Sequence, residues 1–387
     1  MSELYLLEPD SPGPEWAPFA GVRPIAELRA GAWLIRERWE AALDAETTAT
    51  IGAHVPGFHE AGAAPVIANG PASGPAIVVA SWFAPTGARI TLAPTVRRLT
   101  HRGTTVGWIL GPRDTWRGPY ATGPELEIEG LVLRGAFDLI TALELLLEAD
   151  CADFLAAPAL GLPKGSIVIG DAERVICRSA VIEPGVVFDV RNGAVVLEED
   201  VEVRHGTRLE GPVFVGQKTR VHGGFIRASA FGPECRVHGE VASTVFVGYD
   251  NKSHDGFVGH SVLGPWVNLG AGTITSNLKN TYGSVRLDLP DARIETGRLN
   301  LGTLFGDHAK TAIGTMLSTG TVVCAGANVF GAAPPKYVPP FAWGSDGRER
   351  VSEEGFLRVA ERVLGRRSVE FTAAVRSSLQ QIYVRGT

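Results

Sequence analysis

The feature that most constrains the fold is a six-residue step of apolar residues in the second half of the sequence. Aliphatic residues recur at this interval in several runs, and glycine follows many of them. An α-helix repeats about every 3.6 residues and a simple strand about every two, so neither accounts for the spacing. A step of six predicts a parallel β-helix, in which each step forms one flat side of a three-sided coil. The clearest runs are Ile169, Val175, Val181 and Val187, then Leu209, Val215 and Val221, then Leu317, Val323 and Val329.

Composition and charge exclude several classes of protein. The chain has 387 residues, of which 20% are charged and 45% hydrophobic, as in a folded protein of about two or three domains. The net charge is −6 and no stripe of Lys and Arg is present, which argues against nucleic acid as a partner. We find no apolar run long enough to span a membrane and no secretion signal. The four scattered cysteines predict reduced thiols and a cytoplasmic protein.

Residues 1–136 predict an α/β domain. Short apolar runs alternate with a helical pattern over residues 24–43, and this alternation favours a largely parallel sheet with covering helices. A second, stronger helical pattern predicts a linker helix over residues 137–160. The predicted strands cover residues 4–7, 64–68, 76–80, 89–92 and 105–110.

The β-helix is predicted from residue 164 to residue 338. The six-residue step lapses over residues 277–298, where we expect a loop to protrude. Residues 350–387 predict two short amphipathic helices, the second starting near residue 368. We expect this helical tail to cap the end of the β-helix, because the terminal repeats of such a stack need a polar cover.

Residues 251–277 place a histidine inside the repeat. An ammonium group must lose a proton before it can attack a thioester, and a near-neutral histidine is suited to accept that proton. The sequence therefore predicts transfer of an acyl group from a thioester to an amine, with His254 as the general base between two subunits. His260 is a second candidate, and a purely structural role for the histidine is the alternative.

The same segment resembles the acetyltransferase half of the bifunctional N-acetylglucosamine-1-phosphate uridylyltransferase/glucosamine-1-phosphate N-acetyltransferase family. The family motif runs K-x-x-H-x-x-Y-x-G and then V-N-I-G-A-G-T-I-T-x-N. Its spacing matches without a gap from His254 through residues 267–273 to Asn277. The chain is more similar still to an alternative bacterial branch of this family, and that resemblance spans nearly the whole sequence. It is carried by residues 23–31, 248–261, 306–310 and 326–331.

The resemblance implies a Rossmann-like nucleotidyltransferase domain followed by a left-handed β-helix. It implies acetyl-CoA as co-substrate, with sugar phosphate and nucleotide as small-molecule substrates. N-acetylation of an amino-sugar-1-phosphate would be coupled to uridylyl transfer from UTP, with Mg²⁺, and would give UDP-N-acetylglucosamine. We also expect a homotrimer, because a single β-helix offers flat faces and acyl-transfer sites in such coils usually lie between neighbours.

The resemblance also assigns roles to residues around the histidine. His254 matches the catalytic base, and the backbone N–H of Ala271 matches the donor that stabilises the oxyanion. Asn268 and Asn277 match positions that hold the sugar and the acetyl group. The alternative for both asparagines is a side-chain ladder or a turn cap within the coil.

The phosphate of the sugar requires cations. Arg227 matches the phosphate-binding arginine of the family, and Lys252 and Lys279 are further candidates, with solvated surface charges as the alternative for each lysine. The second phosphate lysine of the family falls near Ser243, which carries no charge. Phe257 replaces the family tyrosine and lacks its hydroxyl group. The amino-sugar acceptor therefore stays open.

The N-terminal half departs further from the family pattern. Sugar nucleotidyltransferases carry a loop close to L-x-x-G-x-G-T-R-M after the first strand, and this signature is missing here. Arg23, Arg29 and Gly31 are candidates to bind the nucleotide instead, because guanidinium groups suit phosphate, while ion pairs on a helix are the alternative. Asn69 stands where the family places a magnesium-binding aspartate, and Asp10 is a further candidate. The metal ligands stay unassigned.

Three functions remain compatible with the sequence. The first is the bifunctional enzyme that the resemblance implies. The second is a monofunctional acetyltransferase on an amino sugar or nucleotide-linked amino sugar, with a degenerate nucleotide-binding domain. The third is a non-catalytic β-helix scaffold or sugar-nucleotide sensor, although a scaffold has no need of the spacing that follows His254.

Overall fold

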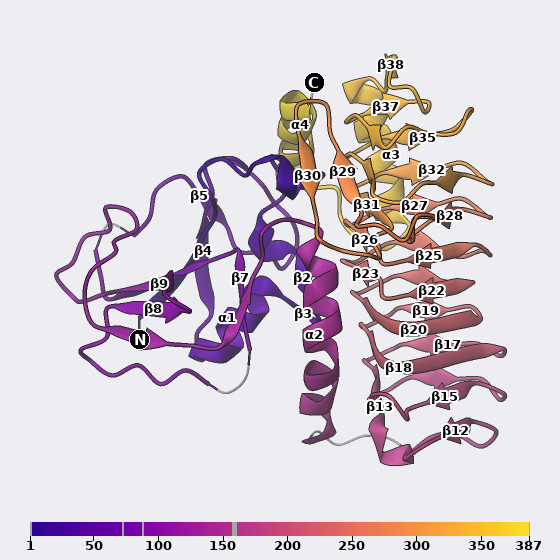
Figure 1. The fold of residues 1–387 in the computed structure, drawn as a ribbon, viewed down its shortest axis with the longest axis horizontal. Coiled ribbons are helices and arrows are strands. Elements are labelled where there is room, and N and C mark those ends of the chain that lie inside the picture. The colour runs from indigo at the N-terminus through magenta and orange to yellow at the C-terminus, as the bar shows by residue number, and fades with distance from the viewer. Residues whose placement is uncertain (1, 72, 87–88, 157–160, 387) are drawn as a thin grey trace.

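The computed structural model describes residues 2–71, 73–86, 89–156 and 161–386. An N-terminal domain and a long β-helix lie side by side, and one helix, α2 (Asp138–Asp153), runs between them (Figure 1). In the described ranges no helix is both long and apolar enough to cross a bilayer. Residues 157–160, the end of the predicted linker, lie outside the described residues.

The N-terminal domain is built on a mixed sheet of seven strands, in which four of the six neighbouring pairs are parallel, as predicted. The strand order is β10-β8-β9-β6-β1-β4-β5; β1 is parallel to β4 and β6, whereas β9 is antiparallel to β6 and β8. The strands are β1 (Glu3–Leu7), β4 (Thr47–Ile51), β5 (Val66–Ile67), β6 (Ala76–Ala80), β8 (Arg98–His101), β9 (Thr104–Leu110) and β10 (Glu125–Glu127), with a separate pair β7 (Phe83–Pro85) and β11 (Gly130–Val132).

Two local predictions in this domain are wrong. The strand predicted at residues 89–92 does not form, because the Ile90 amide donates to the carbonyl of Ala42 at the end of a helix, 2.6 Å away. The helix predicted over residues 24–43 begins only at Ile35. The preceding residues form a 3-10 turn (Ile25–Glu27) and the short hairpin β2 (Arg29–Ala30) and β3 (Trp33–Leu34), before α1 (Ile35–Leu43) starts.

A glycine explains why this segment turns back on itself. Gly31 joins β2 to β3 with φ of 70°, a left-handed conformation that residues with a Cβ rarely adopt. A Cβ at this position would also overlap Asp150 and Arg38, which form a buried ion pair between α1 and α2. At the start of the helix, Glu37 accepts a hydrogen bond from the Leu34 amide at 2.8 Å, which is one half of a capping box.

The C-terminal part is a left-handed parallel β-helix, and its strands stack in register from coil to coil (Figure 1). The 13-stranded sheet holds β12 (Ile167–Ile169), β13 (Val175–Cys177), β15 (Val187–Asp189), β16 (Val195–Leu197), β18 (Thr207–Val215), β20 (Gly224–Phe231), β22 (Glu240–Ala242), β23 (Val245–Phe246), β25 (Phe257–Gly259), β26 (Val262–Leu263), β31 (Thr303–Phe305), β34 (Thr321–Val323) and β36 (Tyr337–Val338).

The 10-stranded sheet forms a second face of the β-helix. It holds β14 (Val181–Ile182), β17 (Glu202–Val203), β19 (Arg220–Val221), β21 (Arg236–Val237), β24 (Asn251–Lys252), β27 (Asn268–Leu269), β32 (Lys310–Thr311), β35 (Asn328–Val329), β37 (Ala342–Trp343) and β38 (Glu349–Arg350). A parallel pair, β28 (Ile274–Thr275) and β33 (Met316–Leu317), continues the face that starts with β22 and β25.

The predicted six-residue step describes the core well in the middle coils. Leu209, Val215 and Val221 are fully buried, as the repeat requires. In the first coil the step is shifted by one residue: Val181 is 64% exposed, and its neighbour Ile182 enters the core instead. Because successive side chains of a strand point to opposite faces, a shift of one residue exchanges the inner and outer positions.

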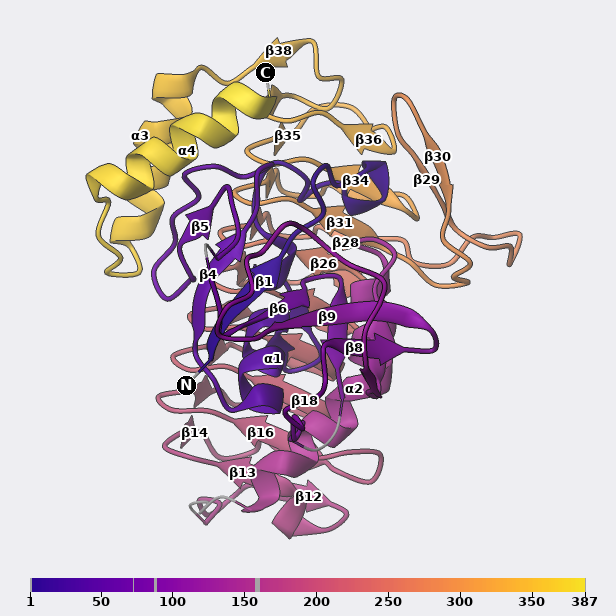
Figure 2. The same cartoon turned by 90° about the vertical axis from the view of Figure 1, so that its left-hand side faces the viewer.

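The loop predicted at residues 277–298 protrudes as expected. It contains an antiparallel hairpin of β29 (Arg286–Asp288) and β30 (Arg293–Glu295), which stands out from the side of the β-helix (Figure 2). Arg298, at the base of the hairpin, donates to Glu144 of α2 at 2.6 Å. The insertion is therefore attached to the helix that separates the two domains.

The C-terminal helices join the two domains instead of only capping the β-helix. They are α3 (Glu353–Gly365) and α4 (Ala373–Gly386), so the second helix starts later than predicted. Both helices bury apolar side chains around Phe341 of the β-helix. On the other side, Ser378 accepts a hydrogen bond from the His59 amide at 3.0 Å, and Arg385 donates to the Gly21 carbonyl at 2.7 Å.

Candidate acyl-transfer and nucleotide sites

His254 lies in an exposed turn between β24 and β25, at a corner of the β-helix. This turn stacks on the next coil, because the Gly272 amide donates to the Asp255 carbonyl at 2.8 Å. Ala271 therefore lies at the same corner, one coil further on. Its N–H finds no acceptor among the residues that the structure describes. The corner thus combines a base with an amide donor that is free to bind an oxyanion.

Lys252 stabilises the turn that carries His254. Its side chain is buried, and Nζ donates to the carbonyl oxygens of His238, at 2.9 Å, and His254. Burial lowers the pKa of Lys252 to about 8. The ammonium group therefore joins neighbouring turns of the coil from inside, where a sugar phosphate on the surface does not reach it.

We expect the stability of the wild-type protein, relative to a Lys252→Met variant, to rise between about pH 8 and about pH 10. The folded-state pKa of Lys252, about 8, lies below the ordinary 10.5, so in this window the unfolded chain binds more protons than the folded one. Urea unfolding of both proteins at several pH values measures the difference. If the difference in unfolding free energy between the two proteins does not change with pH, burial does not lower the pKa of Lys252.

A second group of predicted residues lies at the other end of the same face. The Asn277 amide is 2.7 Å from Nδ1 of His260, and burial lowers the pKa of this histidine. Arg227 is exposed and lies close enough to His260 to lower that pKa further. Phe257, in the strand between the two groups, is half-buried with its ring over Gly259. One chain therefore presents the predicted residues along an open face.

Two predicted residues lie apart from this face. The Asn268 side chain, on the 10-stranded sheet, accepts a hydrogen bond from the Asn251 amide at 2.6 Å, as a ladder between successive coils. Lys279 lies at the start of the insertion and donates to the Ser284 carbonyl. Neither side chain contacts His254 in the single chain.

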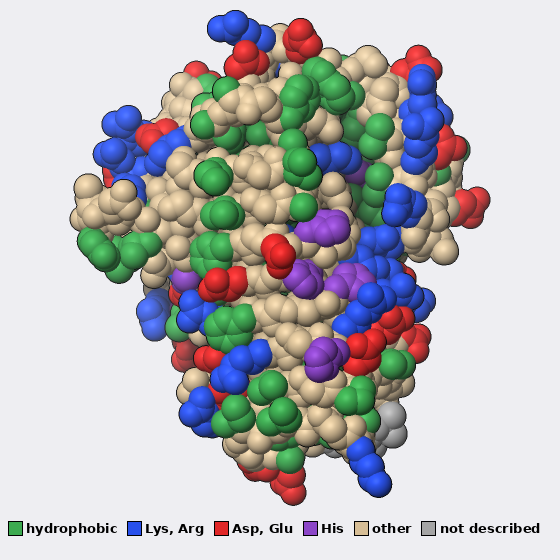
Figure 3. Space-filling model, turned by 90° about the vertical axis from the view of Figure 1, so that its right-hand side faces the viewer, with side chains coloured by type: hydrophobic (Ala, Val, Ile, Leu, Met, Phe, Trp, Pro, Cys, Tyr) green, Lys and Arg blue, Asp and Glu red, His purple; other side chains and the backbone are tan. Residues whose placement is uncertain are grey.

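A row of histidines on this surface was not anticipated. Figure 3 shows histidine side chains gathered on the face of the β-helix that is turned away from the N-terminal domain. Four of them recur about once per coil, a spacing that is visible in the sequence once the coil length is known. They are His205, His222, His238 and His254. His238 Nδ1 lies 3.3 Å from the carboxylate of Asp255, so the row reaches the proposed base.

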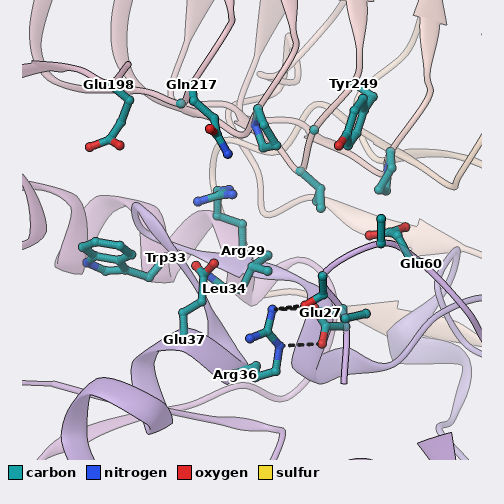
Figure 4. A pocket seen from close by; sticks show the side chains of 18 of the residues that line it. Glu27, Arg29, Trp33, Leu34, Arg36, Glu37, Glu60, Glu198, Gln217 and Tyr249 are labelled. Carbon is teal, nitrogen blue, oxygen red and sulfur yellow. Dashed lines mark hydrogen bonds and ion pairs between the residues drawn. The ribbon is translucent and has the colours of Figure 1, made fainter. Parts of the chain in front are cut away.

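A cavity of about 330 Å³ lies between the two domains (Figure 4). The β2–β3 hairpin, the start of α1 and the loop that follows β4 form one wall, and corners of the β-helix form the other. Ligands of open α/β sheets bind outside the carboxyl ends of their parallel strands, which is where the loop after β4 lies. The rings of Trp33, Phe214 and Tyr249 line the cavity together with Gln217 and Glu198.

Arg29 is the buried cation of this cavity. Its side chain is 5% exposed, and Figure 4 shows the guanidinium group pointing from the N-terminal domain towards Gln217. One nitrogen donates to the Ala32 carbonyl, but Nε has no hydrogen-bond partner among the described residues. Burial lowers the pKa of Arg29. An unpaired buried guanidinium group is costly in free energy, so an anionic ligand here would stabilise it.

Arg23 and Gly31, the other predicted nucleotide residues, hold the structure together. Arg23 is fully buried and forms ion pairs with Asp307 of the β-helix, at 3.0 Å, and Glu60. It also donates to the Glu27 carbonyl at 2.8 Å, so all three of its nitrogens are engaged within the protein. Of the three predicted residues, the structure brings only Arg29 to the wall of a cavity.

The end of β1 is occupied by a carboxylate of the protein itself. Glu8 is buried and accepts hydrogen bonds from the amides of Ile25 and Ala26, at 2.8 and 3.0 Å. Asp10 and Asn69 are exposed. Within the described ranges, no three His, Cys, Asp or Glu side chains converge to hold a metal ion. The described residues therefore form no ready site for the magnesium ion that the resemblance implies.

Comparison with known proteins supports a class of transferase. Residues 6–116 match the family described as sugar nucleotidyl transferase, so the N-terminal domain is a sugar nucleotidyltransferase domain. A segment of 67 residues is 34% identical to a bifunctional sugar-1-phosphate nucleotidylyltransferase/acetyltransferase of Sulfurisphaera tokodaii. That segment covers 17% of this chain and 17% of the length of the relative. Both findings support the family resemblance seen in the sequence.

Proposed function

We propose that the protein transfers the acetyl group of acetyl-CoA to the amine of an amino-sugar-1-phosphate such as glucosamine-1-phosphate. We further propose that it couples this step to uridylyl transfer from UTP, which would give UDP-N-acetylglucosamine. The nucleotidyltransferase match and the name of the relative, which joins both kinds of transfer, support the proposal. Sugar phosphates and nucleotides are the small-molecule substrates that this family implies.

The observation that carries acetyl transfer is the exposed corner shared by His254 and Ala271. In the proposed step, the imidazole accepts a proton from the amine as the nitrogen bonds to the thioester carbonyl carbon. The C–S bond then breaks, and the imidazolium returns the proton to the sulfur, which releases coenzyme A as the thiol. The Ala271 amide donates to the carbonyl oxygen as it becomes negative. Arg227 and Asn277, at the other end of the face, bind the sugar phosphate and orient the acetyl group.

For the nucleotide we propose the cavity between the domains. Its support is Arg29, the buried cation of the β2–β3 hairpin, which lines this cavity and forms no ion pair with a described carboxylate. The rings of Trp33 and Tyr249 offer flat surfaces for a base or a sugar. A monofunctional acetyltransferase is the second candidate. Glu8 favours it, because the Glu8 carboxylate already accepts hydrogen bonds from backbone amides that could otherwise donate to a phosphate.

One assay tests the proposed function. Purified protein is incubated with acetyl-CoA and glucosamine-1-phosphate while free thiol is measured, and UTP and Mg²⁺ are then added while pyrophosphate is measured. We expect both products. If thiol is released but no nucleoside triphosphate gives pyrophosphate, the monofunctional acetyltransferase is the remaining function. If neither thiol nor pyrophosphate is formed, the non-catalytic scaffold or sensor is the remaining function.

We expect the active form to be a homotrimer, with each site shared between subunits. The two residue groups lie on an open face of one chain, so the neighbouring copy would close the site. If so, His254→Ala and Asn277→Ala variants, each inactive alone, should regain activity when they are unfolded together and refolded as mixed trimers. Light scattering gives the assembly state. A fully active monomer at micromolar concentration, or mixtures that stay inactive, would rule out a shared site.

A further inference from the structure

A second cavity, of about 290 Å³, lies between α3 and the 10-stranded sheet. Three basic side chains line it, together with two amides and two aromatic rings, and none of the lining residues is acidic. They are Lys310, Arg366 and Arg367; Asn251 and Asn268; and Tyr249 and Trp266, with Val267 and Val363 completing the wall. The composition is that of a site for a strongly anionic group.

The three cations lack carboxylate partners. Lys310 Nζ donates to the His308 carbonyl at 2.8 Å, and Arg367 Nε donates to the Glu234 carbonyl at 3.2 Å. No carboxylate among the described residues lies within ion-pair distance of Lys310, Arg366 or Arg367. The nearby Glu234 carboxylate is itself bound by Arg236 at 3.0 Å. Glu234 therefore acts on Arg367 without an ion pair, and the positive charge around this cavity is compensated only in part.

Burial adds to the free energy cost of this arrangement. It lowers the pKa of Lys310 to about 8 and that of Arg367 below its ordinary value, where Arg236 acts in the same direction. Like charges gathered in a partly desolvated space repel one another, and a bound anion relieves both the repulsion and the loss of hydration. The fold holds these cations close together despite the free energy that this costs, which indicates a role in binding an anion.

The rigid support comes from the coil stacking and from an aromatic wall. Asn268 and Lys310 are paired in register on β27 and β32, so their side chains project side by side. The Tyr249 and Trp266 rings stack with centroids 4.3 Å apart, and Trp266 also stacks on the buried His308. Val363 and the two arginines come from outside the β-helix: Val363 lies in the last turn of α3, and Arg366 and Arg367 directly follow its end.

We propose that this cavity binds the phosphate groups of a small molecule, with Lys310, Arg366 and Arg367 donating to the phosphate oxygens and Asn268 at its rim. Three cations suit a pyrophosphate better than a single phosphate ester, because each can take its own oxygen. The site is separate from the His254 corner. It shares one wall, Tyr249, with the cavity that holds Arg29. The proposal concerns binding alone and does not depend on acetyl transfer.

The test is titration of the full-length protein with inorganic pyrophosphate by calorimetry. We expect wild-type protein to bind, and Arg366→Gln and Lys310→Met each to weaken binding by roughly 10- to 100-fold, the usual worth of a charge-assisted hydrogen bond. Arg366 is exposed, so its variant should fold normally. Arg362→Gln is the matched control, because Arg362 is exposed near the end of α3, close to Arg366 in sequence, but does not line the cavity.

Two results would overturn the proposal. The first is no binding of pyrophosphate by the wild-type protein at millimolar concentration. The second is an equal loss of binding in the Arg362→Gln control, which would indicate general attraction to the helix. Competition then identifies the source of the phosphate: displacement by coenzyme A assigns the site to the acyl donor, and displacement by UTP or a nucleotide sugar assigns it to the nucleotide. Failure of all of these to displace pyrophosphate would also reject a ligand site.

Discussion

Replacing His254 with alanine is expected to lower the rate of acetyl transfer by roughly 10²- to 10⁴-fold, the usual worth of a general base. The imidazole is exposed in a turn, and the turn itself is held by Lys252 through the backbone carbonyl of residue 254. Removal of the side chain should therefore leave the coil and the assembly intact. Thiol release at saturating acetyl-CoA, with circular dichroism and light scattering on the same samples, measures both effects.

The matched control is His205→Ala. His205 is exposed in a comparable turn of the same histidine row, but it lies three coils away and bonds to the Pro184 carbonyl. We expect its replacement to leave acetyl transfer within a few-fold of the wild type. Near-normal turnover of the His254→Ala variant at neutral pH would show that His254 is structural, and His260 would become the next candidate.

Replacing Arg23 with methionine is expected to destabilise the protein by about 3–5 kcal/mol, because it leaves a buried carboxylate without its partner. Arg23 and Asp307 are both buried, one in each domain, and Glu60 completes the ion-pair group. We expect an early unfolding step in which the domains separate, seen as a second transition in calorimetry.

Two further variants make this prediction specific. Arg89→Met breaks an ion pair with Asp44 whose side chains are both about two-thirds exposed, and should cost no more than about 1 kcal/mol. The double variant Arg23→Met/Asp307→Leu removes both charges and should recover part of the lost stability. If Arg23 instead binds nucleotide, Arg23→Met would keep wild-type stability and lose only pyrophosphate release.

The β-helix was predictable because its coil imposes a periodicity that no other fold shares. The inner positions of the middle coils, such as Leu209 and Val215, follow that period. The period is displaced in the first coils, where Ile182 and Phe188 take the core positions predicted for Val181 and Val187. In the N-terminal domain, the apolar pattern of residues 24–43 continues through a hairpin, and only Gly31 among these residues marks the turn.

The candidate sites were less predictable, because their geometry depends on contacts between distant parts of the chain. Whether Arg23 faces a ligand or an ion pair is decided by Asp307, 284 residues later. The position of His254 and Ala271 at one corner follows from their spacing and the coil length. That Lys252 lies inside the coil could not be read from its type, since lysine is almost never fully buried.

The contact between α4 and the loop after β1 also determines the order in which the molecule can be completed. Arg385 and Gly21 are separated by 364 residues. During synthesis, the N-terminal sheet has all its strands long before α4 leaves the ribosome, and the β-helix can grow coil by coil behind it. Closure of the junction must wait for the final helix. Until then the apolar side chains that α4 covers, Val22 and Phe341 among them, face water, and in this interval the nascent chain is most exposed to aggregation.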